Sequence, residues 1–152
     1  MTTVEEAILA RRSTKFFEDR PIDAALLDRI IELTLAAPSS FNLQPWRIVV
    51  IREPEQRAAI RAASYHQPQF EHAPVTLVFA VTLEGWRDHL QEVTDQGFSS
   101  GAWPTEFEET IRTSIDGFQT DLERRGKIRE YAIKDAMIAA THTVLAAESL
   151  GV

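Results

Sequence analysis

Residues 11 to 15 (RRSTK) are the first side chains in the sequence that could bind an anion. Arg11, Arg12 and Lys15 supply three positive charges, and Ser13 adds a hydroxyl. An arginine can donate two parallel hydrogen bonds to a phosphate, and a lysine acts as a point charge. The segment therefore predicts a phosphate site. A structural alternative stays open, because cations at the end of a helix stabilise the helix dipole.

A second segment, residues 38 to 45 (PSSFNLQP), places hydroxyls and amides between two prolines. Ser39 and Ser40 can donate or accept, and the amides of Asn42 and Gln44 can do both at once. Such amides match the alternating donors and acceptors along the edge of a planar heterocycle. The flanking prolines reduce the conformational entropy of the loop, which predicts a preorganised binding wall. Alternatively, the same side chains cap backbone groups in a polar turn.

Helices and strands predicted from apolar periodicity must position these two segments. A short helix over residues 4–12 leads into the cationic segment, and Asp23 is the predicted N-cap of a second helix that ends before Pro38. The other predicted helices are 53–64, 84–94, 105–126 and 128–150. The predicted strands are 46–51 and 74–83, the second buried on both faces. Residues 95–104 are predicted as a loop, and Thr105 with Glu108 as a capping box.

The order of elements, mostly helices with two strands, predicts an α+β fold. The helix over 128–150 is apolar around most of its circumference, which is typical of a central core helix. Two strands alone make a poor sheet. We therefore expect that a partner supplies further strands or that the chain is C-terminally truncated.

Composition narrows the possible functions. At 152 residues and 44% hydrophobic content, the chain predicts one domain over 1–152. A formal net charge of -7 argues against generic binding to nucleic acid or to anionic membranes. The absence of cysteine excludes disulfides, thiolate catalysis and cysteine-based zinc sites. The sequence shows no bilayer-spanning run and no signal-peptide pattern, so a cytoplasmic protein is expected.

Several familiar site motifs are missing from the sequence. No G-x-G-x-x-G follows a predicted strand, and neither a P-loop nor a G-x-S-x-G elbow occurs. The four histidines lack the spacing of metal ligands, so no metal site is predicted. No side chain is marked as a catalytic acid, base or nucleophile.

The two polar segments together resemble a known signature. RRSTKFF, followed after one helix by APSSFNLQPWRIVV, is similar to the N-terminal pattern of the nitroreductase family, the FMN-dependent NAD(P)H oxidoreductases. The resemblance continues through YHQPQFEHAPVTLVFAV and YAIKDAMIAATHTVLAAESLGV. It implies a three-layer α+β fold, with a central, mostly antiparallel sheet between helices and a long buried core helix. The sheet would be incomplete in this chain.

The resemblance also implies a set of FMN-binding residues. In this sequence they are Arg11, Arg12, Ser13, Lys15, Pro38, Ser39, Ser40, Asn42, His66 and Gln69. His66 replaces an asparagine that commonly contacts the flavin ring in relatives, and Gln67 is a nearby alternative. Phe41 is the implied substrate-pocket residue, while Trp46 matches the motif with a packing role.

The implied activity is reduction of a nitroaromatic, a quinone or a similar small acceptor. NADH or NADPH would pass a hydride to flavin N5, and the acceptor would then take it in a ping-pong sequence, within a homodimer that binds FMN at its interface. Relatives usually continue past SLG, which is a further reason to expect truncation. Three alternatives stay open: a dimer that binds flavin or another ligand without turnover, a related flavin enzyme with another substrate, and a helical interaction module.

Overall fold

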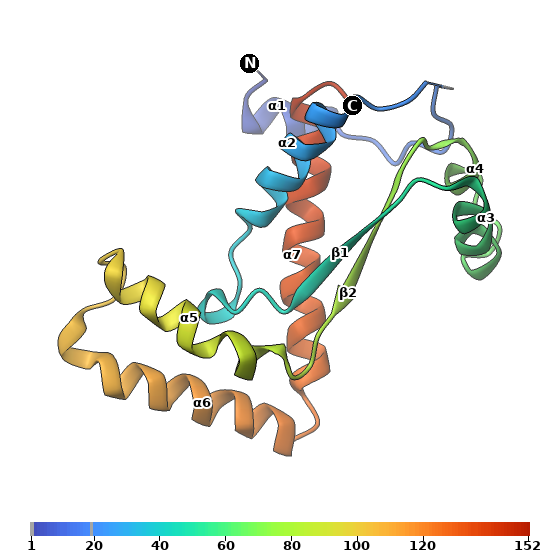
Figure 1. Cartoon of the computed structure of the whole chain (residues 1–152). Helices are drawn as coiled ribbons and strands as arrows, with labels where there is room; N and C mark the ends of the chain where they lie inside the picture. Colours follow the sequence, from blue (N-terminus) through green and yellow to red (C-terminus); the bar gives the residue numbers. More distant parts are fainter. Residues whose placement is uncertain (1, 19) are drawn as a thin grey trace. The chain divides into compact units, whose positions relative to one another are not determined.

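The computed structural model describes residues 2–18 and 20–152. The described residues form helices and one pair of strands (Figure 1), and the predicted α+β composition is confirmed. The elements are α1 (Val4–Ala10), α2 (Ala24–Leu35), the 3-10 turn η1 (Ser40–Asn42), β1 (Trp46–Ile51), α3 (Pro54–Ala63), α4 (Gln69–His72), β2 (Thr76–Val81), α5 (Gly85–Ser99), the 3-10 turn η2 (Thr105–Phe107), α6 (Glu108–Arg124) and α7 (Ile128–Ser149).

The chain divides into two compact units. The first comprises Met1–Ala37, Ile48–Phe79 and Ala139–Val152, and the second comprises Pro38–Arg47 and Ala80–Ile138. Both strands and helix α7 therefore have a part in each unit. The cationic segment belongs to the first unit and the proline-flanked loop to the second. A single domain over residues 1–152 stays a prediction.

Two capped helices begin the first unit. Thr3 and Glu6 form a capping box, in which the Glu6 N–H donates to Thr3 Oγ1 (3.2 Å) and the Thr3 N–H donates to Glu6 Oε2 (2.7 Å). Asp23 accepts a hydrogen bond from the Leu26 N–H at 3.0 Å, so the predicted N-cap of α2 is confirmed. These caps fix where α1 and α2 begin.

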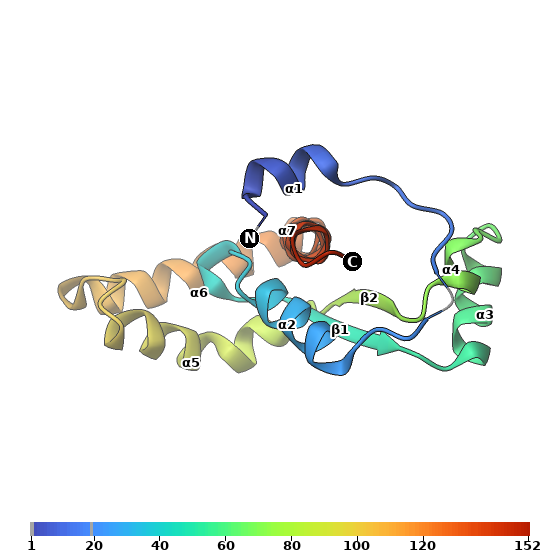
Figure 2. The same cartoon turned by 90° about the horizontal axis from the view of Figure 1, so that it is seen from above.

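Helix α2 lies beside the C-terminal part of α7 in the first unit (Figure 1, Figure 2). Its buried residues Leu27, Ile30 and Thr34 recur at helical spacing. The hydroxyls of Thr34 and Thr143 lie 2.8 Å apart and form a hydrogen bond between the two helices. This pair gives the unit a polar link inside an otherwise apolar contact.

The same unit contains the packed helices α3 and α4 and the greater part of the strand pair. Arg57 of α3 donates through Nη1 to the carbonyls of Glu71 (3.2 Å) and Ala73 at the end of α4. Strands β1 and β2 form a two-stranded antiparallel sheet. The expectation that β2 is buried on both faces is wrong, because none of its residues is fully buried. The elements that pack on the sheet leave every residue of β2 at least partly accessible to solvent.

In the second unit, α5 and α6 lie side by side in both views (Figure 1, Figure 2). Buried Leu43, Trp86 and Ile115 form the apolar cluster of this unit. The indole N–H of Trp86 donates to Glu123 Oε1 at 3.1 Å. The guanidinium of Arg87 donates to both carboxylate oxygens of Glu123, at 2.6 and 2.5 Å, so α5 and α6 are also joined by charge.

Two local predictions in this unit are wrong. Residues 95–99, predicted as the start of a loop, continue α5. Gly97 serves packing there, since a Cβ on it would lie 2.5 Å from the ring of Trp103. The predicted capping box of Thr105 and Glu108 does not form, and α6 begins after η2 without a side-chain cap. Glu108 instead accepts hydrogen bonds from Arg112 at 3.0 and 2.8 Å.

Helix α7 has one buried face and one exposed face. Its buried positions are Ala132, Asp135, Ala136, Ala139 and Ala146. On the other face Met137 is 58% exposed, and Ile138 and Val144 are also exposed. The long apolar helix predicted from the sequence is confirmed, but a single chain covers only part of its circumference.

Candidate functional site

The 38–45 loop in the second unit is held by hydrogen bonds of its own side chains. Ser39 Oγ accepts from the backbone N–H of Gln44 at 2.9 Å, which closes the loop across five residues. The side-chain amide of Gln44 donates to Asn42 Oδ1 at 3.2 Å. The capping role that the sequence left open as an alternative is therefore real for Ser39. This capping does not involve every polar group of the loop.

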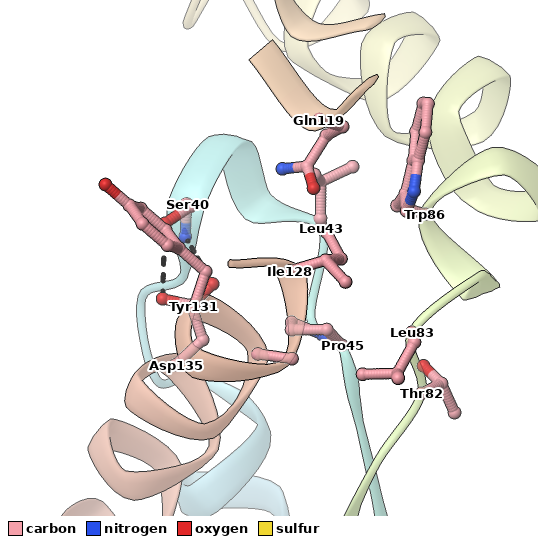
Figure 3. A pocket seen from close by; sticks show the side chains of 11 residues that line it. Ser40, Leu43, Pro45, Thr82, Leu83, Trp86, Gln119, Ile128, Tyr131 and Asp135 are labelled. Carbon is pink, nitrogen blue, oxygen red and sulfur yellow. Dashed lines mark hydrogen bonds between the residues drawn. The ribbon is translucent and has the colours of Figure 1, made fainter. Parts of the chain in front are cut away.

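Ser40 is tied to helix α7 by a buried carboxylate that sequence reasoning missed. The Ser40 N–H donates to Asp135 Oδ2 at 3.1 Å, and its hydroxyl lies 3.2 Å from Oδ1 (Figure 3). Asp135 is 7% exposed, and no ion pair involves it among the residues described. Burial raises the pKa of Asp135 above its ordinary value, and the two hydrogen bonds from Ser40 oppose that rise.

A signal for Asp135 was present in the sequence. It is an acid on the face of α7 that otherwise carries Ala132, Ala136 and Ala139, at helical spacing. An acid on an apolar face needs a polar partner, and the partner is Ser40. A small cavity of about 20 Å³, room for about one water molecule, lies beside the pair and is bordered by Tyr131 and Gln119.

Phe41 is exposed at the turn of the loop and contacts an aromatic pair. Its ring centroid lies 5.6 Å from that of Phe118 in an edge-to-face arrangement, and Phe118 in turn lies 5.5 Å from Tyr131. The three rings form an apolar surface next to the polar loop. The sequence had assigned only Phe41 to a substrate pocket, because Phe118 and Tyr131 stand in unremarkable helical patterns.

In the first unit, the cationic segment leaves helix α1 in an extended conformation. Helix α1 ends at Ala10, two residues earlier than predicted. Nη1 of Arg12 donates to the carbonyls of Leu9 (2.6 Å), Ala10 (2.9 Å) and Arg11 (2.9 Å). Arg12 thus caps the helix end, as the structural alternative expected. In the described residues, no hydrogen bond or ion pair engages the side chains of Arg11 and Ser13.

Lys15 reaches a second predicted segment of this unit, residues 65–69. Its Nζ donates to Gln67 Oε1 at 3.2 Å, and the amide of Gln69 donates to the same oxygen at 2.7 Å. Gln69 Oε1 is buried and has no hydrogen-bond partner among the residues that the structure describes. The fold thus brings Lys15, Gln67 and Gln69 together across about fifty residues of sequence, while His66 is exposed beside them.

Within residues 2–18 and 20–152, the backbone is in the left-handed region at five residues that are not glycine. Their φ angles are 52° at Phe41, 57° at Asn42, 44° at Gln44, 55° at Tyr65 and 55° at His66. This conformation is uncommon for residues with a side chain and is found disproportionately where a ligand is held. All five lie in two of the segments that the sequence had singled out.

Other kinds of site are not supported. No group of three or more His, Asp or Glu residues in the described part of the chain could hold a metal ion. Among the helices described, none is both long and apolar enough to cross a membrane. A larger pocket of about 640 Å³ in the first unit is bordered by Phe16, Phe17 and Val75 and by none of the predicted site residues.

Comparison with known proteins gives consistent relatives. An NADH dehydrogenase of Thermus thermophilus is 46% identical over 91 residues, which is 60% of this chain and 44% of that protein. A Bacillus subtilis protein assigned as an NAD(P)H nitroreductase, YodC, is 27% identical over 153 residues, 99% of this chain and 73% of its own length. The chain thus matches less than half of the Thermus protein.

A solved structure has the same fold. It is a protein of Exiguobacterium sibiricum assigned as a nitroreductase and crystallised in complex with FMN. The two structures superpose with a TM-score of 0.84 at 24% identity, covering 99% of this chain and 72% of that one. The predicted fold is therefore confirmed. The family model for the nitroreductase family matches residues 8–152. This chain belongs to the nitroreductase family.

Proposed function

We propose that the protein is an FMN-dependent oxidoreductase that uses NADH or NADPH to reduce a nitroaromatic, a quinone or a similar small acceptor. Membership of the family and the names of the relatives support this class of reaction. The observation that carries the proposal is the clustering of left-handed backbone in the 38–45 loop and at residues 65 and 66. Such strained backbone persists where the surroundings hold it and where it has a use.

The residues of the first unit fit a flavin phosphate and the polar edge of its ring. The side chains of Arg11 and Ser13 have no hydrogen-bond or ion-pair partner in the described chain, and Lys15 donates one hydrogen bond to Gln67. Gln69 Oε1 is an acceptor left without a donor, which normally costs about 1–3 kcal/mol when buried. A ring N–H of a ligand would satisfy it. Polar, planar and anionic features of FMN match this combination of donors and one unused acceptor.

In the proposed homodimer, Ser39, Ser40 and Asn42 of a second copy would form the other wall of the site, with Pro38 limiting its flexibility. The hydroxyl and amide groups would orient the ring, and Phe41 with Phe118 would border the acceptor with apolar surface. Cations near the ring favour its negatively charged reduced form. Each of these roles is binding or orientation, and no side chain of this chain is assigned a proton transfer.

When bound, the flavin supplies the two-electron chemistry, taking up a hydride from NAD(P)H and giving it to the acceptor in a ping-pong sequence. We further propose a homodimer, in which each copy contributes residues to both sites. The exposed apolar side chains Met137, Ile138 and Val144 on α7 are the kind of surface that a second copy would cover.

The test is steady-state oxidation of NADH and of NADPH by the chain loaded with FMN, with menadione and nitrofurazone as acceptors. Oxidation that depends on both FMN and acceptor, with parallel double-reciprocal plots, is the expected result. Arg52→Ala, an exposed cation outside the site, is the control and should leave the rate unchanged. Stoichiometric FMN binding with no acceptor-dependent oxidation would contradict the proposed activity and favour a ligand-binding dimer.

A further inference from the structure

We propose that Asp135 is the positioning residue that fixes the 38–45 loop in its binding conformation. The inference rests on the proposed function, since it concerns the wall of the flavin site in the second unit. Asp135 is the residue of α7 that holds Ser40 by both its backbone N–H and its hydroxyl (Figure 3). It touches neither substrate nor flavin in this scheme and acts through Ser40.

A carboxylate on the buried face of α7 has an energetic cost. Asp135 lies on the face of α7 with Ala132, Ala136 and Ala139, where an apolar side chain would pack without penalty. A buried carboxylate without a cationic partner is unfavourable unless hydrogen bonds compensate it. Its two hydrogen bonds within the described part of the chain both come from Ser40. The acid is therefore explained by the loop it holds.

The backbone that follows Ser40 is strained and needs support from neighbouring contacts. Phe41 and Asn42 both adopt left-handed conformations, at φ 52° and 57°. For a residue with a Cβ this conformation is disfavoured, so it persists only where neighbouring contacts define it. Asp135 fixes the residue before the two strained positions, and the Ser39–Gln44 hydrogen bond closes the loop after them. Loss of the carboxylate would remove the contact that holds the loop before Phe41, and the Ser39–Gln44 hydrogen bond would remain.

The carboxylate of Asp135 also accepts from a backbone donor, the Ser40 N–H. The Ser40 N–H points at Oδ2 of Asp135, and without that oxygen it would be left partly buried and unpaired. An asparagine at position 135 could keep both contacts, because its oxygen accepts from the N–H and its NH₂ donates to the serine hydroxyl. An alanine could keep neither. The two substitutions therefore separate hydrogen bonding from charge.

The experiment compares Asp135→Ala and Asp135→Asn with Thr143→Ala, a control that removes a polar contact of the same helix in the other unit. Amide hydrogen exchange of residues 39–44 is measured in the flavin-free chain, and FMN affinity by quenching of flavin fluorescence. Asp135→Ala is expected to speed exchange in the loop and to raise the FMN Kd roughly 10-fold to 100-fold. Asp135→Asn should stay within about 3-fold of the wild type on both readouts.

Thr143→Ala should lower the melting temperature yet leave loop exchange and FMN affinity unchanged. Wild-type exchange in the loop of Asp135→Ala, with wild-type FMN affinity, would overturn the positioning role and leave the proposed function standing. Absence of FMN binding by the wild type would overturn the proposed function instead, while loop exchange would still decide the role of Asp135. If Asp135→Ala is insoluble, Asp135→Leu decides, because it also lacks both acceptor oxygens and wild-type loop exchange in that variant would likewise overturn the inference.

Discussion

The two polar segments of the predicted site are held in different ways. In the second unit, the 38–45 loop has internal partners at both ends, through Asp135 on Ser40 and through Ser39 on Gln44. In the first unit, Arg12 caps its own helix, and the side chains of Arg11 and Ser13 make no hydrogen bond or ion pair within the described residues. One segment is shaped by the protein, and the other presents free charge.

This difference indicates that the two segments contribute to binding in different ways. A loop that the protein has already ordered loses little entropy on binding and fixes the position of the ligand. Free cations contribute attraction and charge-assisted hydrogen bonds, but they gain their order from the ligand. Substitutions in the cationic segment should therefore change affinity without changing stability. Substitutions in the loop and its support should change stability, and affinity only as a consequence.

The largest effect is expected from the double variant Arg11→Ala, Lys15→Ala. Loss of two cationic donors to a phosphate should raise the FMN Kd by roughly 100-fold, since each charged hydrogen bond contributes about 1.5–3 kcal/mol before compensation. The melting temperature should stay near that of the wild type. Fluorescence titration and thermal denaturation measure the two quantities, with Arg52→Ala, Lys127→Ala as a charge-matched control. A large fall in melting temperature with unchanged FMN affinity would show that these cations contribute to stability and not to binding.

The next effect concerns the left-handed backbone of Asn42. Asn42→Val places a β-branched residue at φ 57° and should destabilise the chain by about 1–2 kcal/mol relative to Asn42→Gly. Both variants lose the amide that accepts from Gln44, so their difference isolates the backbone term. Urea denaturation followed by tryptophan fluorescence measures it. Equal midpoints for the two variants would show that the loop does not hold this conformation.

A smaller, pH-dependent effect is expected at Asp135. Because burial raises its pKa in the folded chain, the folded state binds the proton more tightly than the unfolded state does. Its contribution to stability therefore falls as pH rises from the ordinary pKa through the raised one. Asp135→Asn cannot titrate, so its stability relative to the wild type should increase over that window and be constant above it. Urea midpoints between pH 4 and 8 measure the difference, and a difference that decreases over that window would contradict this sign.

The smallest effect is expected at Glu130. Hydrogen bonds from Lys134 and Lys127 lower the pKa of this exposed carboxyl to about 2. Its contribution is present above the ordinary pKa and is lost as pH falls from there toward 2. Solvent screens such pairs, so Glu130→Gln should change the urea midpoint at neutral pH barely above experimental error. A large shift would mean that these ion pairs carry more of the stability of α7 than their exposure allows.

The sequence predicted local structure well where periodicity and caps were both present. Strand Trp46–Ile51, the N-cap Asp23 and the long final helix were all predicted correctly. Errors arose where a residue found a different partner from the one its local pattern suggested. Gly97 suggested a loop but serves the packing of Trp103, and Glu108 pairs with Arg112 in place of capping a helix. Glu108 and Arg112 are one helical turn apart, so their ion pair competes locally with the cap.

The candidate site was foreseen in its segments and less so in its connections. The two polar segments stood out by residue type, and the contact of Lys15 with Gln67 was not predicted. The support from Asp135 was missed, because it depends on a contact between residues 95 positions apart. The same holds for the contact of Phe41 with Phe118. Which of these residues touch a flavin stays a prediction.

The most direct test of the central claim is a titration of the flavin-free, 152-residue chain with FMN, followed by gel filtration and a visible spectrum. We predict one FMN retained per chain, with absorbance bands shifted from those of free flavin, and loss of that retention in Arg11→Ala, Lys15→Ala. A chain that elutes folded but without flavin, even after excess FMN has been added, would contradict the claim that this chain binds flavin through these residues.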